Sequence, residues 1–202
     1  NLGGGAPARH CAALSLLALG AEEEAAARLE QLALRPDAGG EAARAAILGQ
    51  AGWRALGEES GVPVHIFRLA GIYGPGRSAF DSLKAGTARR IVKPGQVFSR
   101  IHVEDIATIL VASVSKAGPG EVYNVCDDEA APPQDVIAYA AELMGVAPPP
   151  EIPFDQAELS PMAQSFYRDN KRVRNDKIKQ ALGVALAYPT YREGLRALLP
   201  ST

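Results

Sequence analysis

The sequence predicts an α/β protein with a largely parallel sheet, and two observations lead to that prediction. Apolar, β-rich runs at 63–69 and 121–125 alternate with helix-favouring segments, a pattern typical of parallel strands, which need a crossover between them. The first run also ends abruptly at Gly74-Pro75-Gly76. Open α/β sheets bind ligands at the carboxyl ends of their strands, so this turn is a candidate site edge. The alternative is a buried strand followed by an ordinary turn.

The other elements follow from hydrophobic periodicity and from the positions of Gly and Pro. Around Lys93-Pro94-Gly95-Gln96, two β-rich arms within 88–103 predict a hairpin or a strand–turn–strand unit. The proline-rich stretch 146–154 predicts a linker or an extended loop. Helices are expected at 22–34, 41–59, 78–86, 104–114, 133–144, 175–182 and 191–199.

Composition restricts the classes of partner and compartment. The chain has 202 residues, a formal net charge of -2 and 47% hydrophobic residues, enough for one well-cored domain with or without a small second lobe. Without a basic stripe or an apolar run of about 20 residues, neither nucleic acid nor a membrane is expected as a partner. Cys11 and Cys126 form no disulfide framework, and the histidines are scattered, so we expect a cytoplasmic protein without a metal.

Four stretches, in order, resemble one family: VPVHIFRLAGIYGPG, FSRIHVEDIA, EVYNVCDDEAAPPQDVIAYAAELMG and NDKIKQALG. They are similar to the C-terminal half of the extended short-chain dehydrogenases/reductases, the NAD-dependent sugar epimerases and dehydratases. With YPTYREGL, they look especially like an atypical subgroup, and the resemblance covers 61–195. It implies a Rossmann-type doubly wound parallel sheet with a small C-terminal α/β lobe. The implied domains are 1–145, NAD(P)-binding with some substrate-lobe insertions from 77–100, and 146–202, mainly the substrate lobe.

The resemblance also implies binding residues. In the family, the strand that ends in Tyr-Gly-Pro lies beside the nicotinamide and the substrate, which makes Gly71, Tyr73 and Gly74 candidate cofactor contacts. The family usually has Asn where this chain has Gly71, which puts one contact in doubt. Arg68 and Arg100 are the candidate substrate contacts.

Arg100 matches an arginine that commonly contacts the phosphates of a nucleotide-linked sugar, a task suited to the planar guanidinium fork. The alternative is a surface arginine paired with Glu104 or Asp105. We interpret His102 as a core histidine rather than a catalytic base. Asp105 is interpreted as a helix-start residue rather than an acid catalyst.

The segment Cys126-Asp127-Asp128 ends a predicted strand, and so lies on the expected ligand edge, but the signal is weak.

A glycine-rich start is a second candidate cofactor site. Gly3, Gly5 and Ala8 match G-x-G-x-x-A, a loop in which backbone amides approach a pyrophosphate. Only Asn1 and Leu2 precede it, whereas the fingerprint requires a preceding strand. Glu22, Glu23 or Glu24 lies near the expected offset of a ribose-binding acid, although a Glu run that opens a helix needs no ligand to explain it.

The family's catalytic pair, Tyr-x-x-x-Lys, is absent from its expected place. Counting back from 61–63 puts the tyrosine position at Ala42 and the lysine position at Ala46, and alanine can do neither job. The catalytic residues are therefore unknown. The strands that this half of the fold needs are also missing between Gly40 and Glu41. Either residues are omitted there, which we favour, or the protein is a truncated relative.

The leading functional hypothesis is NAD- or NADP-linked epimerase, dehydratase or reductase chemistry on a nucleotide sugar or a similar hydroxylated small molecule. The rival is a catalytically inactive dinucleotide-binding or regulatory module with the same fold, and a third possibility is a structural remnant that binds nothing. The expected partner is a small-molecule substrate, and a homodimer is possible.

Overall fold

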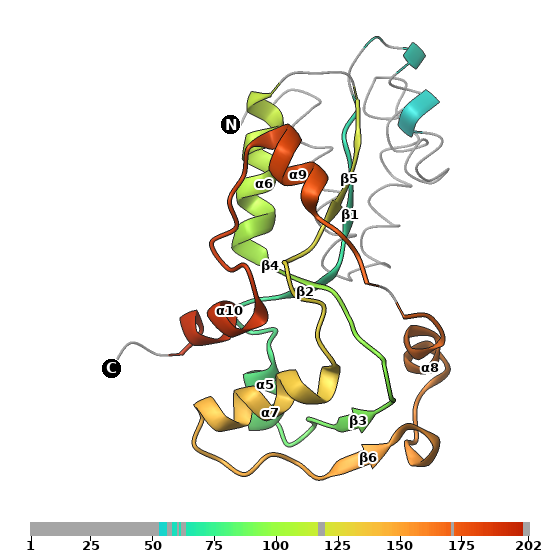
Figure 1. Ribbon diagram of the computed structural model, residues 1–202, viewed down its shortest axis with the longest axis vertical. Coiled ribbons are helices and arrows are strands. Elements are labelled where there is room, and N and C mark those ends of the chain that lie inside the picture. The colour runs from blue at the N-terminus through green and yellow to red at the C-terminus, as the bar shows by residue number, and fades with distance from the viewer. Residues whose placement is uncertain are drawn as a thin grey trace, which may run out of the picture. The chain divides into compact units, whose positions relative to one another are not determined.

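The computed structural model describes residues 53–55, 58–59, 61, 64–116, 120–170 and 172–199 (Figure 1). These residues form two compact units. Unit 1 contains the described residues up to Phe67 together with 116 and 120–123, and unit 2 contains Arg68–Ser115 and 124–199. The predicted helix at 22–34, most of the one at 41–59 and the junction of Gly40 with Glu41 lie outside the described residues. The predicted domain boundary after residue 145 stays a prediction.

The two β-rich runs that opened the sequence argument pair with each other. Strand β1 (Ile66–Leu69) is the neighbour of β5 (Val122–Val125). Ile66 N–H donates to Glu121 O at 2.8 Å, and Ala70 N–H donates to Val125 O at 3.0 Å. The bonds advance in the same direction along both strands, so the pair is parallel, as the sequence predicts.

Two further parallel pairs correct the predicted hairpin. Strand β2 (Gly71–Tyr73) pairs with β4 (Arg100–His102), with Tyr73 opposite His102. Strand β3 (Arg90–Val92) pairs with β6 (Glu151–Pro153). The hairpin alternative is wrong, because β3 and β4 each find a different parallel partner, and the strand–turn–strand alternative holds. The proline-rich stretch predicted as a loop contains β6.

Most predicted helices are confirmed in the described residues, with ends that differ by one or two residues. The helices are α5 (Ala79–Lys84), α6 (Val103–Ser115), α7 (Pro133–Leu143), α8 (Pro161–Arg168), α9 (Asp176–Leu182) and α10 (Tyr191–Ala197), with a 3-10 turn at Phe154–Gln156. Only α8 was not predicted. None of the helices in the described ranges is long and apolar enough to cross a membrane.

Helices α5, α7 and α10 build the main core of unit 2. Helix α7 packs against α5, β3 and α10, and α10 also contacts β4 (Figure 1). The apolar stripe of α7, which the sequence predicts from its periodicity, buries Val136 and Ala140. They meet side chains from α5 and α10, so the core cluster comprises Phe80, Ala131, Val136, Ala140, Tyr191 and Leu195. The α/β class with parallel strands is thus confirmed.

Candidate functional site

A pocket in unit 2 lies between β2, the start of β4 and helices α5, α7 and α10. Its volume is about 350 Å³. Tyr73, the last residue of β2, and Arg100, the first residue of β4, both line it. Arg77, Ser78, Arg89 and Tyr191 add further polar groups to a wall that is otherwise largely apolar. Three guanidinium groups around one cavity can bind an anion of at least two charges.

Two main-chain carbonyl groups hold the Arg100 side chain in place. Its Nη1 donates to Phe98 O at 2.9 Å and to Ala131 O at 3.1 Å. The alternative of a surface arginine paired with Glu104 or Asp105 is wrong, since the guanidinium is partly buried and these carbonyls are its partners. Burial lowers the pKa of Arg100, opposed chiefly by the nearby Asp127, but arginine keeps its charge in proteins.

Tyr73 presents a hydroxyl group that no other described residue binds. The ring is buried, and it stands edge-on to His102 with the ring centroids 5.1 Å apart. Within the described residues its Oη has no hydrogen-bond partner. Burial and then the charge of Asp127 raise the pKa of Tyr73 above its usual value. The phenol therefore stays neutral at physiological pH, where it can donate a hydrogen bond but not act as a base.

Asp127 lies just after β5, and its carboxyl group is also without partners. The residue is 3% exposed, and neither carboxylate oxygen has a hydrogen-bond partner in the described ranges. Its main-chain N–H donates to Arg100 O at 2.6 Å. Burial raises the pKa of Asp127 to about 7, against the opposing charge of Arg100. With a pKa near 7, the carboxyl group can be protonated or ionised near neutral pH.

His102 is a core residue, as the sequence interpretation favoured. It is 1% exposed, and its Nδ1 accepts a hydrogen bond from Glu104 N–H at 3.3 Å. Burial lowers the pKa of His102, so the ring is neutral and its proton belongs on Nε2. Among the described residues Nε2 has no partner. The ring packs against Tyr188, with the centroids 4.0 Å apart.

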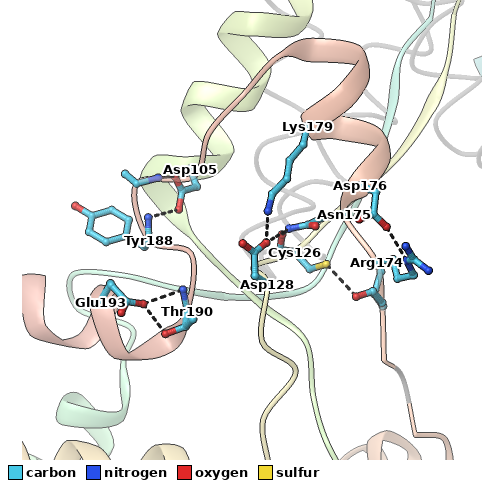
Figure 2. A network of polar contacts seen from close by, with 12 residues as sticks. Asp105, Cys126, Asp128, Arg174, Asn175, Asp176, Lys179, Tyr188, Thr190 and Glu193 are labelled. Atoms are coloured by element: carbon cyan, nitrogen blue, oxygen red, sulfur yellow. Dashed lines mark hydrogen bonds and ion pairs between the residues drawn. The ribbon is translucent and has the colours of Figure 1, made fainter.

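Asp105 anchors the segment that leads into α10, whereas the sequence interpretation made it a helix-start residue. Its Oδ1 accepts from Ala187 N–H at 2.7 Å and its Oδ2 from Tyr188 N–H at 3.1 Å (Figure 2). The carboxylate, although it lies in the first turn of α6, thus binds a loop more than 80 residues away. This geometry does not support a role for Asp105 as an acid catalyst.

A second network fixes the end of β5. Asn175 Nδ2 donates to Cys126 O at 2.9 Å and to Asp128 Oδ1 at 2.6 Å, and Lys179 pairs with Asp128 at 2.5 Å (Figure 2). These contacts hold the segment that carries Asp127. The Cys126 thiol is fully buried, and burial raises its pKa to about 12, so it is unreactive.

The remaining predicted site residues lie outside the pocket wall. Gly74 is buried against α6, where an added Cβ would lie 2.6 Å from Val103 Cγ1. Packing on Val103 therefore explains this glycine without a ligand. Gly71 and Arg68 are exposed and do not line the pocket. The predicted cofactor residues Gly3, Gly5 and Ala8, like Ala42 and Ala46, lie outside the described residues, so those predictions stay predictions.

Sequence reasoning missed the groups that complete the pocket. Arg77 and Ser78 directly follow the Gly-Pro-Gly turn, and Tyr191 begins α10. The position of Arg77 after a turn at a strand end was the available signal. No cluster of three or more His, Cys, Asp or Glu side chains in the described ranges could hold a metal ion.

Comparison with known proteins gives matches by structure. No protein-family model and no curated protein matches the chain. A functionally unknown conserved protein from Silicibacter pomeroyi DSS is 59% identical, with a TM-score of 0.69; the match covers 82% of this chain and 56% of that one.

Two structures of known enzymes or cofactor complexes match at lower identity. RMD from Pseudomonas aeruginosa, complexed with NADPH, is 20% identical with a TM-score of 0.57, over 78% of this chain and 53% of that one. The dTDP-glucose 4,6-dehydratase of Bacillus anthracis str. Ames, in complex with NAD, is 18% identical with a TM-score of 0.55, over 72% and 46%. The chain shares the Rossmann fold of these structures. It spans about half the length of these relatives.

Proposed function

We propose that the chain is part of an NAD- or NADP-dependent epimerase, dehydratase or reductase that acts on a nucleotide sugar or a similar hydroxylated small molecule. The pocket of unit 2 is the observation that supports this proposal. It brings three arginines to one cavity, an arrangement suited to a diphosphate. The fold neighbours include a nucleotide-sugar dehydratase with NAD and a protein with NADPH.

Each described pocket residue has a distinct task in this proposal. Arg100, anchored by two carbonyls, presents the rest of its guanidinium to the anionic group, and Arg77 and Arg89 line the same cavity. Tyr73 contributes its ring to the pocket wall, whereas its hydroxyl group is buried beside Gly194.

The described residues fit a dinucleotide only in part. Tyr73 offers an unpartnered hydroxyl at the strand end, but the space beside Gly74 is filled by Val103. The predicted pyrophosphate loop at Gly3, Gly5 and Ala8 lies outside the described residues. A bound NAD or NADP would supply hydride transfer, and the protein would supply orientation and electrostatics.

A catalytically inactive module is the second candidate. Ala42 and Ala46 stand where the resemblance places the family's Tyr and Lys. Neither Tyr73, whose pKa is raised, nor His102, whose ring is buried, replaces that base. A cytoplasmic location and a homodimer stay predictions.

Cofactor binding and turnover separate these candidates. We expect NADH or NADPH fluorescence to change on titration with the full chain, and a panel of nucleotide sugars to be converted slowly. Loss of a positioned general acid–base removes a factor of about 10²–10⁴ in rate. Dinucleotide binding without any turnover supports the inactive module, and absence of both contradicts the proposal.

Arg100→Met should weaken the binding of UDP-glucose by about 10- to 150-fold, the equivalent of the ~1.5–3 kcal/mol of a hydrogen bond to a charged group. Isothermal titration calorimetry measures this change. Phe98 and Ala131 keep their main-chain bonds to each other, but Asp127 loses the cation that favours its ionised form. The free energy of unfolding should therefore also fall, and the titration is run at a temperature at which the variant is folded.

Two arginine variants serve as controls for this titration. Arg174→Met removes an exposed arginine of the same unit that pairs with Asp176 at 2.6 Å, and it should leave the affinity unchanged. Arg68→Met tests the second substrate contact that the resemblance implied. Equal losses in all three variants would contradict a specific anion site at Arg100.

A further inference from the structure

Asp127 is linked to the pocket through Arg100. Its main-chain N–H donates to Arg100 O, whereas its side chain does not line the cavity. The carboxyl group is buried, and no described side chain hydrogen-bonds either of its oxygens. Main-chain groups of Glu129 and Arg100 favour the ionised form less than the charge of Arg100 does, so the buried carboxylate depends chiefly on that charge.

The groups that face Asp127 come from three segments of the unit. Arg100 on β4 is the cation that favours its ionised form, and Asp128, the next residue, disfavours that form. Tyr73 on β2 and Cys126 at the end of β5 are the neighbouring titratable groups, and both stay neutral at physiological pH. Lys179 pairs with Asp128 and offsets part of its charge.

Arg100 therefore acts electrostatically on Asp127 and is also part of the pocket wall. It is the cation that favours the ionised carboxyl group, and it also lines the cavity. An anion bound at Arg100 neutralises the charge that Asp127 relies on, and it adds a negative charge nearby. Both effects favour the protonated carboxyl group, because a like charge disfavours the ionised form.

We propose that Asp127 takes up a proton when an anionic group binds at Arg100, so that the pocket binds an anion and a proton together. This rests on the anion site of the proposed function. The proton comes from the solvent and adds to one Asp127 carboxylate oxygen, and no other bond is made or broken. Asp127 acts here through Arg100 as a positioning residue and does not touch the ligand.

Burial places this titration in an accessible range. Because burial raises the pKa of Asp127 to about 7, both forms are populated near neutral pH before the anion arrives. Binding shifts the remaining ionised fraction to the protonated form. Affinity should therefore fall as the pH rises above 7, by up to about tenfold per pH unit.

Calorimetry with UDP-glucose tests the proposal on the full chain. The diphosphate diester of UDP-glucose keeps its charge between pH 6 and pH 9, so protons taken up belong to the protein. Titrations in Tris and in imidazole, two cationic buffers of different ionisation enthalpy, give the number of protons from the difference in apparent enthalpy. At pH 7.5 we expect an uptake of up to about 0.8 proton per ligand.

Two neighbouring aspartates provide the variant and its control. Asp127→Asn should still bind UDP-glucose, but with no proton uptake and a flat affinity between pH 7 and pH 9. Asp128→Asn changes an exposed carboxylate that pairs with Lys179 and should keep the uptake. If Asp127→Asn does not fold, carboxyl ¹³C NMR of the wild type follows the Asp127 titration with and without UDP-glucose.

The outcomes separate this inference from the proposed function. UDP-glucose binding without proton uptake, or with the same uptake in Asp127→Asn, overturns the role of Asp127 and leaves the anion site intact. No binding of UDP-glucose, nor of millimolar sulfate as a simpler anion, overturns the anion site and with it the proton coupling. Proton uptake that is lost in Asp127→Asn but kept in Asp128→Asn supports both the anion site and the role of Asp127.

Discussion

Gly194→Val should lower the free energy of unfolding by about 3 kcal/mol, at the upper end of the cost of overpacking a core. Gly194 is a buried residue of α10, and a Cβ placed there would lie 2.0 Å from Tyr73 Oη and 2.6 Å from Cζ. The Tyr73 ring is rigid and buried, so it cannot turn away as an exposed side chain would. Urea unfolding of the full chain measures the change.

Two further variants attribute the Gly194 effect to Tyr73. Ala197→Val adds the same β-branched side chain at an exposed site of α10 and should cost less than about 1 kcal/mol. In the Gly194→Val background, Tyr73→Leu should cost less than it costs in the wild type, because it relieves the clash. If the costs of Gly194→Val and Tyr73→Leu in free energy of unfolding simply add, Tyr73 does not pack against α10 at Gly194.

Asp127→Asn should become more stable relative to the wild type as the pH rises. In the wild type the pKa of Asp127 is about 7 when folded, against an ordinary 3.8. Between these values the folded chain binds more protons than the unfolded chain, so wild-type stability falls as the pH rises. The asparagine variant does not lose stability in this way. The difference in free energy of unfolding between Asp127→Asn and the wild type should therefore change by about 2.5 kcal/mol between pH 5 and pH 8.

Chemical unfolding at several pH values, with Asp128→Asn as the control, measures this linkage. Asp128 is exposed, so its replacement should not reproduce the effect. A constant stability difference between Asp127→Asn and the wild type from pH 5 to pH 8 would show that Asp127 titrates at an ordinary pKa. Asp127 would then exchange no proton near neutral pH, and the proposed proton uptake would fail.

Local sequence signals predicted most elements but not their partners. Periodicity and the Gly and Pro positions located β1, β5 and helices such as α6 and α7. The segment around Lys93 looked like a hairpin because its two arms are adjacent and β-rich. Strand pairing is decided by long-range packing, and β3 instead pairs with β6, about 60 residues further along.

Helix α8 shows a signal that was present and overlooked. Ser160 caps it by accepting a hydrogen bond from Ala163 N–H at 3.2 Å, and Pro161 occupies the first helical position. Ser followed by Pro is a standard helix start. The polar composition of the segment and the preceding proline cluster obscured it.

Burial limited what could be predicted about the site. Asp127 and Asp128 are identical neighbours in the sequence, yet the Asp127 side chain is buried with no side-chain partner, whereas Asp128 is exposed and paired with Lys179. Arg100 was singled out through the resemblance, whereas its carbonyl partners come from the bridge between Phe98 and Ala131, more than 30 residues apart. Such environments depend on tertiary contacts that no local pattern encodes.

A crystal structure of the full chain with UDP-glucose tests the anion site most directly. We expect the diphosphate in the pocket of unit 2, with phosphate oxygens within about 3 Å of the Arg100 guanidinium, a normal distance for a charge-assisted hydrogen bond. A diphosphate bound elsewhere, with Arg100 still bonded only to Phe98 O and Ala131 O, would contradict the account.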